Sequence, residues 1–278
     1  MQRAQARILP QGRLHLQHGP IDLIVDAHGT PRDVAYAPAA RRFETVLEEL
    51  VSELPALRRQ SAGGMPARTP VGRRMVAAVA PFAAEFVTPM AAVAGAVADE
   101  ILAEILTVPG IRKAYVNNGG DVAVHLRDDE VFRATIAASP PATIILSADA
   151  PVRGIATSGW QGRSQSMGIA DSVTVLAGDA AMADAAATLI ANAVDLPGRP
   201  GIGRTPACDL KPDSDLGNRP VTTAVPLLDP SEKIEALNAG LDHARTYCGR
   251  GLIHAAWLVL QGETCCTAHP AFLETADA

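Results

Sequence analysis

The strand-forming segments of this chain are concentrated in one block of sequence between residues 112 and 177. Six short runs in this block are rich in β-branched residues and separated by turn residues, a pattern typical of β-strands. These runs are 113–117, 121–126, 131–137, 143–147, 153–157 and 172–177. Because no helix-like segment interrupts the block, the order favours an α+β or mixed α/β fold over a doubly wound parallel sheet.

Helical periodicity marks the segments on either side of this block. Apolar residues recur at spacings of three and four from Phe43 to Leu54, which builds one apolar helix face. The alanine-rich run at 180–194 is a helix by propensity. The full set of helices that we expect is 40–59, a short one within 75–85, 90–107, 180–194 and 231–245. We expect further strands at 13–17, 21–25 and 252–260.

Two segments lack a regular pattern. Residues 197–222 hold five prolines among glycines and aspartates, which predicts a long loop of the kind that is often functional. From His269 onward we expect a loose tail. The length of 278 residues and the 48% hydrophobic content predict a single domain over 1–278.

Charge and hydropathy exclude two classes of partner. The formal net charge is -6 and the arginine pairs are isolated, so we expect no nucleic-acid role, which would require clustered cations. The longest apolar stretch is far shorter than the roughly 20 residues that span a bilayer, so we expect no membrane span. The N-terminus lacks the apolar run of a signal peptide, and the four cysteines form no CxxC pair, so we expect a cytoplasmic protein.

Asn118, Gly119, Gly120 and Asp121 lie between two predicted strands. Glycines let a backbone approach a ligand closely, and the N–H groups of such a turn can cradle a phosphate or the edge of a flavin ring. A plain hairpin explains the same residues, because Asn-Gly between strands is a strong hairpin signal. Both interpretations stay open.

Thr157, Ser158 and Gly159 end another predicted strand. Two hydroxyls on flexible backbone suit contacts to a phosphate or a ribityl chain. A turn capped by Ser and Thr side chains is the alternative.

Asp184 and Thr188 lie four residues apart on the helix predicted at 180–194, so their side chains share one face. A carboxylate and a hydroxyl are hard donors, which suit Mg²⁺ or Ca²⁺ rather than zinc. A solvated helix face is the alternative. Small residues at 91–98 predict a closely packed helix start, and Asp99 after them is either an acid near a site or an exposed side chain.

Taken in order, these segments resemble motifs of the ApbE flavin-transferase superfamily. The similarity lies within residues 90–195 and involves 91–98 with Asp99, 117–122, 156–159 and 172–190. Residues 12–25 and 50–58 resemble more particularly a divergent, ApbE-like family found in bacteria and archaea. The resemblance implies an α+β, mixed α/β fold with antiparallel-rich sheets packed by helices around a nucleotide cleft.

The resemblance also implies a ligand set. ApbE enzymes use Mg²⁺ to cleave FAD and attach FMN to an acceptor protein. Their metal ligands correspond to Asp184, Thr188 and the carbonyl of Ala91. The nucleotide contacts correspond to Asn118, Gly119, Gly120, Asp121, Thr157, Ser158 and Gly159. Asp121 is the predicted catalytic residue that positions the substrate, and a homodimer is left open.

The chain departs from the ApbE pattern at two places. Ala94 stands where the family has a lysine, and residues 160–168 replace a segment that carries a histidine. Arg163 in this segment is the candidate replacement cation, since a guanidinium binds phosphate in a bidentate manner. Three functions therefore stay open: flavin-nucleotide chemistry, flavin binding and delivery without transfer, and a cleft reused for another small molecule, such as by a hydrolase of a nitrogen heterocycle.

Overall fold

The computed structural model describes residues 3–61, 67–136, 142–267 and 273–275. These residues form two compact units, and the predicted α+β fold with antiparallel sheets is confirmed. The first unit comprises Met1–Phe132, Leu146–Ala156 and Ala177–Asp184. The second comprises Arg133–Ile145, Thr157–Leu176 and Ala185–Ala278. The organisation of the whole chain as one domain stays a prediction.

The first unit is built on an antiparallel sheet of six strands in the order β1-β2-β3-β4-β5-β8. The strands are β1 (Gln5–Ile8), β2 (Leu14–His18), β3 (Ile21–His28), β4 (Lys113–Asn118), β5 (Asp121–Leu126) and β8 (Gly154–Ser158), of which Gly154–Ala156 belong to this unit. Register places Leu14, Val25 and Val116 in one cross-strand row, and all three are buried. Period-two alternation therefore gives the sheet one apolar face.

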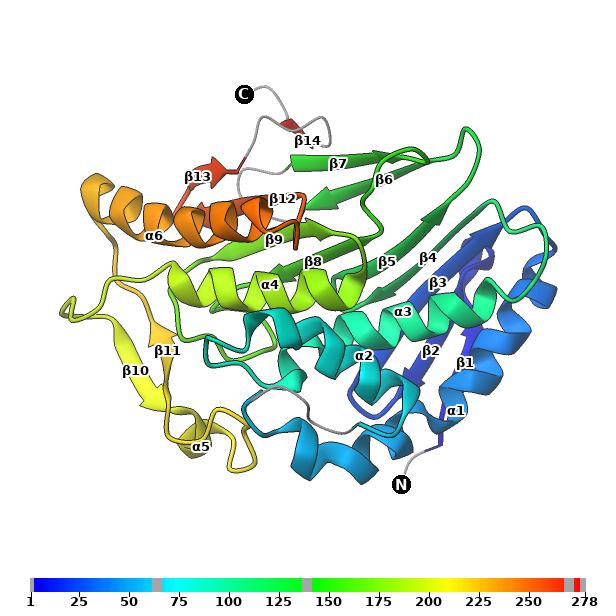
Figure 1. The fold of residues 1–278 in the computed structure, drawn as a ribbon, viewed down its shortest axis with the longest axis horizontal. Coiled ribbons are helices and arrows are strands. Elements are labelled where there is room, and N and C mark those ends of the chain that lie inside the picture. Colours follow the sequence, from blue (N-terminus) through cyan, green and yellow to red (C-terminus); the bar gives the residue numbers. More distant parts are fainter. Residues whose placement is uncertain (1–2, 62–66, 137–141, 268–272, 276–278) are drawn as a thin grey trace. The chain divides into compact units, whose positions relative to one another are not determined.

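Helices cover this apolar face (Figure 1). Both α1 (Arg32–Leu57) and α3 (Val93–Ile105) contact the sheet, and α2 (Pro70–Val79) packs against them. A short 3₁₀ turn, η3 (Pro89–Ala92), leads directly into α3. Proline begins both η3 and α2, where its missing N–H costs no hydrogen bond.

The second unit contains the antiparallel strands β9 (Ser172–Ala177, without its last residue), β12 (Ala255–Leu260) and β13 (Glu263–Cys266), in the order β9-β12-β13. Helix α6 (Pro230–Gly249) packs on β12 and β13 (Figure 1). A separate sheet has the order β14-β7-β6, from β6 (Val131–Ile136), β7 (Ala142–Ser147) and β14 (Leu273–Thr275). Helix α4 (Ala180–Ala193) begins in the first unit and continues in the second after Asp184.

Two sequence predictions about irregular segments were wrong. The predicted loop at 197–222 contains β10 (Gly203–Pro206) and the short helix α5 (Ala207–Leu210), and β11 (Pro220–Ala224) begins within it. Pro206 and Pro220 pair at the end of this ribbon, where a missing N–H is tolerated. The predicted tail contains β14, which pairs with β7, while 268–272 and 276–278 lie outside the described residues.

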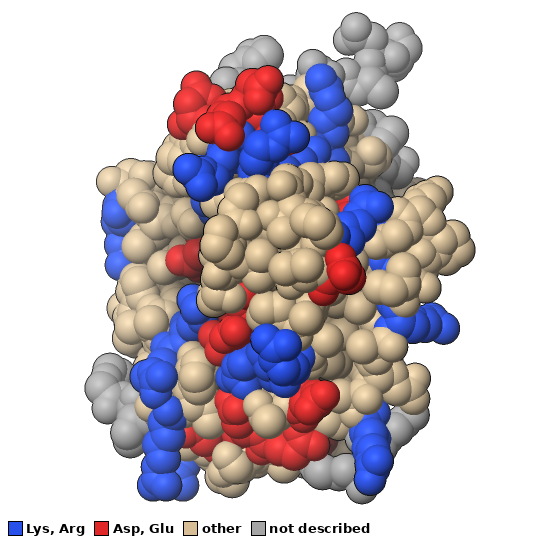
Figure 2. All heavy atoms as spheres, turned by 90° about the vertical axis from the view of Figure 1, so that its right-hand side faces the viewer, with Lys and Arg blue, Asp and Glu red and all other residues tan. Residues whose placement is uncertain are grey.

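The surface of the described residues mixes both signs of charge on the face drawn in Figure 2, where lysine and arginine alternate with aspartate and glutamate. Among the described residues, no helix combines the length and apolar character needed to cross a membrane.

Glycine allows α3 to approach the start of α4 closely. A Cβ placed on Gly95 would collide with the backbone carbonyl of Ala180, and one on Gly154 would collide with that of Asp179. A Cβ on Gly178 would meet nothing within 4 Å. The three glycines therefore differ in the space available to a side chain.

We predict that Gly95→Ala lowers the free energy of unfolding by about 1–3 kcal/mol, because the added methyl group forces backbone apart. Gly178→Ala is the matched control and should change stability by less than about 0.5 kcal/mol. Urea unfolding followed by circular dichroism measures both. Equal effects of the two substitutions would contradict the close approach.

Candidate functional site

The carboxylate of Asp184 is bound to the first turn of another helix. Its Oδ2 accepts hydrogen bonds from the backbone N–H of Ala94 at 3.1 Å and of Gly95 at 3.0 Å. These N–H groups open α3 and have no partner within that helix. Asp184 itself lies in the second turn of α4. One helix thus supplies the cap of the other.

Asp99 makes the reciprocal connection from α3 to α4. Its Oδ1 accepts from the N–H of Ala180 at 3.1 Å, and its Oδ2 accepts from the N–H of Ala181 at 2.9 Å. The next two donors of α4 are satisfied locally: the N–H of Met182 by Oδ1 of Asp179, and the N–H of Ala183 by the carbonyl of Asp179. The N–H groups of the first three residues of α4 therefore all donate to a carboxylate.

The hairpin between β4 and β5 contributes two polar side chains to the same face of the sheet. Asn118 pairs in register with Asp121 across Gly119 and Gly120, whose φ angles are 66° and 118°. The hairpin interpretation of these residues is therefore correct. Residues directly opposite in an antiparallel pair share a face, so Asp121 lies on the face that carries buried Asn118.

The amide of Asn118 is already engaged. Its Nδ2 donates to the carbonyl of Ala94 at 3.0 Å, so Ala94 is held through its carbonyl by Asn118 and through its N–H by Asp184. The N–H of Gly120 donates to Oδ1 of Asn117 at 2.9 Å. Asn118 and Gly120, which we predicted as nucleotide contacts, thus have structural partners within the first unit.

The carboxylates of this cluster lie close enough to disfavour one another's charge. Burial is the largest cause that raises the pKa of Asp184 well above its usual value, and the charges of Asp121 and Asp99 raise it further. The N–H groups of Gly95 and Ala94 act in the opposite direction. Asp184 is partly exposed to solvent, and the dense packing of protein atoms around it still disfavours its charged form.

The surroundings of Asp99 raise its pKa as well. Burial is the largest cause that raises its pKa to about 6, and the charge of Asp179 adds to this. The N–H groups of Ala181 and Ala180 and the cation Arg74 lower it. Three carboxylates thus share one region of the first unit, and a cation there would relieve their mutual repulsion.

The oxygen donors of this cluster suit Mg²⁺, which keeps several water ligands, better than a metal that is coordinated entirely by protein side chains. Among the described residues, no three His, Cys, Asp or Glu side chains gather into a metal-binding group. Mg²⁺ commonly takes only one or two protein carboxylates and completes its shell with water and phosphate oxygens. Thr188 follows Asp184 by one turn of α4, and Ala91 lies in η3 just before α3. These are the remaining predicted ligands.

The other predicted site residues belong to the second unit. Alternation along β8 directs Thr157 and Ser158 to opposite faces, and Oγ1 of Thr157 lies 2.8 Å from Oγ1 of Thr174. Gly159 allows close contact with the backbone carbonyl of Asp171. Arg163 is exposed. The hydroxyls of Thr157 and Ser158 therefore lie on opposite faces of β8.

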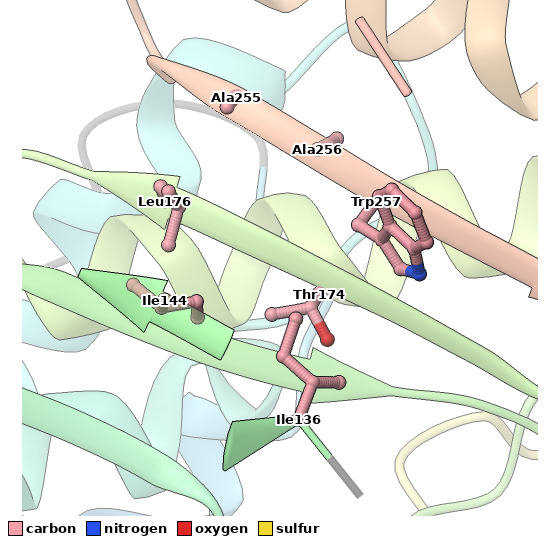
Figure 3. Close-up of a pocket in the computed structure, with 7 residues that line it drawn as sticks. All are labelled: Ile136, Ile144, Thr174, Leu176, Ala255, Ala256 and Trp257. Atoms are coloured by element: carbon pink, nitrogen blue, oxygen red, sulfur yellow. The ribbon is translucent and has the colours of Figure 1, made fainter. Parts of the chain in front are cut away.

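A narrow apolar crevice also lies in the second unit (Figure 3). Trp257 lies beside Thr174 in the adjacent strand, and its Nε1 is buried without a hydrogen-bond partner among the described residues. The rest of the lining comes from Ile136, Ile144, Leu176, Ala255 and Ala256. The crevice is too narrow to admit a water molecule.

Comparison with known proteins decides the family. The family described as AbpE bacteria matches residues 6–266, which is most of the chain. The chain belongs to this family. The resemblance to the ApbE superfamily seen in the sequence motifs is thereby confirmed.

Relatives of this AbpE chain include proteins named UPF0280. The UPF0280 protein MK0206 of Methanopyrus kandleri is 37% identical over 175 residues, which cover 62% of this chain and 69% of that protein. A UPF0280 protein of Methanothrix thermoacetophila is 40% identical over 129 residues, which cover 45% of this chain and 52% of that protein. The match spans about half the length of most of the curated relatives.

Solved structures show a weaker likeness. An apo flavinyl transferase ApbE from Pseudomonas stutzeri matches with a TM-score of 0.46 and 15% identity, covering 96% of both chains. A mutant flavin transferase ApbE from Vibrio cholerae matches with a TM-score of 0.45 and 15% identity, covering 64% of this chain and 85% of that one.

Asp99 gives a test of the cluster's electrostatics. Since its pKa is raised from 3.8 to about 6 on folding, the folded state binds more protons than the unfolded state between these values. The free energy of unfolding therefore falls as pH rises from about 4 to about 6, by on the order of 1–3 kcal/mol. Asp99→Asn cannot titrate, so we predict a correspondingly flatter pH dependence.

Urea unfolding at several pH values between 4 and 7 measures this effect. Asp242→Asn changes an exposed carboxylate on α6 whose charge does not act on Asp99, and it serves as the control. If Asp99→Asn retains the slope of the unaltered protein, the cluster does not disfavour the charge of Asp99.

Proposed function

We propose that this protein is an Mg²⁺-dependent enzyme that acts on a flavin nucleotide, either by transferring FMN or by cleaving the pyrophosphate of FAD. One observation carries the proposal. The carboxylate of Asp184 is hydrogen-bonded to the first turn of α3, and the charge of Asp121 acts on it. Family membership and the motif resemblance support the same chemistry.

Asp184 is the proposed principal metal ligand, and the hydroxyl of Thr188 and the carbonyl of Ala91 are the further ligands that the motif resemblance implies. The two N–H groups that bind Oδ2 of Asp184 orient its carboxylate before any cation arrives. A bound Mg²⁺ would supply a Lewis acid and neutralise charge on a pyrophosphate. Phosphate oxygens and water would complete the shell, as is usual for this ion.

Asp121 is the proposed acid that positions the substrate. It begins β5 directly after the exposed glycine pair, on the face that carries Asn118. Since the N–H of Gly120 already has a partner, the hairpin contributes mainly the side chain of Asp121 and the open space at Gly120, where an added Cβ would meet nothing within 4 Å. This assignment separates the catalytic role of Asp121 from the structural role of Asn118.

The second unit contributes candidates of its own. Ser158 and Gly159 are proposed nucleotide contacts. Thr157 lies on the opposite face of β8 from Ser158. Arg163 is the proposed phosphate-binding cation. An acceptor protein, a cytoplasmic location and a homodimer are further proposals that accompany flavin transfer. Binding and delivery of a flavin without transfer is the second candidate function, and Ala94 in place of the family lysine favours it.

Incubation with FAD and Mg²⁺ tests the proposal through release of AMP. We predict AMP release that stops when the metal is chelated and falls at least about 100-fold in Asp184→Ala. Removing a residue that only orients a metal ligand lowers activity by about 10–100-fold, and removing the ligand itself should lower it at least as much. Asp179→Ala is the matched control, because it removes a carboxylate from the same end of α4. It should retain activity within about 2-fold.

The possible outcomes separate the candidate functions. FAD binding without AMP release favours the delivery protein over the enzyme. Absence of FAD binding, measured by fluorescence quenching, contradicts both and favours a cleft used for another small molecule. AMP release that survives in Asp184→Ala places the chemistry elsewhere in the chain.

A further inference from the structure

We infer that Asp99 is a positioning residue for Asp184, which it holds in place by joining the first turn of α4 to α3. This inference rests on the proposed role of Asp184 as a metal ligand. Asp99 is not itself a ligand in this scheme. Its side chain acts on the backbone from which Asp184 projects.

The reciprocal geometry carries the inference. Asp99 binds the N–H groups of Ala180 and Ala181, and Asp184 lies one helical turn further along α4. Asp184 in turn binds the N–H groups of Ala94 and Gly95, one turn before Asp99 in α3. Four hydrogen bonds thus run between the same two helix turns in opposite directions. Breaking the pair at Asp99 leaves α4 free to shift relative to α3, and Asp184 moves with it.

Asp179 shows that Asp99 does more than cap a helix. Asp179 already caps α4 locally, through the N–H groups of Met182 and Ala183. Asp99 instead comes from 81 residues earlier in the chain, and its partners lie where Gly95 meets the carbonyl of Ala180. Loss of the Asp179 side chain breaks a hydrogen bond within α4, whereas loss of Asp99 breaks the two hydrogen bonds between α3 and α4.

The orientation of a metal ligand is sensitive to such support. Groups that hold a ligand in place typically change metal affinity by about 10–100-fold when they are removed. A carboxylate displaced by about 1 Å still exists in the protein but no longer presents its oxygens correctly. Asp99 is therefore expected to affect cation affinity without contacting the cation.

The test compares Asp99→Ala and Asp99→Asn with the matched control Asp179→Ala in the full chain. Amide hydrogen exchange, followed by NMR, reports whether the N–H groups of Ala94 and Gly95 keep their partner. Titration with Mn²⁺ alone, followed by EPR, reports cation affinity. Neither measurement depends on turnover.

We predict that Asp99→Ala speeds exchange at Ala94 and Gly95 by at least about 10-fold and weakens Mn²⁺ binding by about 10–100-fold. Asp99→Asn should lie between, since its one carbonyl oxygen can accept one of the two bonds. Asp179→Ala should speed exchange at Met182 and leave Ala94, Gly95 and Mn²⁺ affinity within about 2-fold.

Two results would overturn the inference. One is unchanged exchange at Ala94 and Gly95 in Asp99→Ala, or in Asp99→Asn should the alanine variant not fold. The other is an equal loss of Mn²⁺ affinity in both variants without a change in exchange, which would show an effect of charge alone. Faster exchange in a protein that never binds Mn²⁺ supports the positioning role and contradicts the proposed function instead.

Discussion

The exchange of caps between α3 and α4 is the interaction on which the first unit depends. Each helix begins with N–H groups that lack an internal partner and carries a partial positive charge of about one half at that end. Two such ends side by side repel each other. Asp184 and Asp99 place a carboxylate between them in each direction, which satisfies the donors and offsets the repulsion. Gly95 provides the space for this approach, and Gly154 does the same where β8 meets the residue before α4.

The same arrangement leaves an electrostatic strain that is useful for chemistry. Asp184 and Asp99 are stabilised by helix ends, yet burial and neighbouring acids raise the pKa of both carboxyls. Asp121 adds a third carboxylate from the hairpin beside α3. A cation bound by Asp184 would lower the cost of keeping these groups ionised. Structural support and affinity for a hard cation therefore arise from one set of side chains.

Local sequence patterns were sufficient for much of the fold. β-Branched residues and turn residues predicted β5 and β9 with their observed bounds, and alanine content predicted α4 to within a residue. Asn-Gly indicated the hairpin at 117–121 as one of two interpretations. These features depend on neighbours along the chain. The ribbon of β10 and β11 was not predicted because its prolines indicated a loop. Pro206 and Pro220 pair at the end of the ribbon, where no backbone N–H is needed for a hydrogen bond between the strands.

The candidate site could be predicted only in part, because its contacts are distant in sequence. Asp184 was identified from its spacing to Thr188, but its partners Ala94 and Gly95 lie 90 and 89 residues away. Asn118 was expected to face a nucleotide, yet its amide binds Ala94. Nothing local to Asp99 distinguishes it from an exposed helical acid. Only the fold brings it to the start of α4.

The most direct measurement of the central claim is the effect of paramagnetic Mn²⁺ on the amide NMR signals of the protein. If a cation binds where Asp184 meets α3, substoichiometric Mn²⁺ will broaden the signals of Ala94, Gly95 and Asp184 first. Amides of the β10–β11 ribbon should stay sharp at the same ratio. Early broadening at exposed acids such as Asp242, with Ala94 and Gly95 unaffected, would contradict the account.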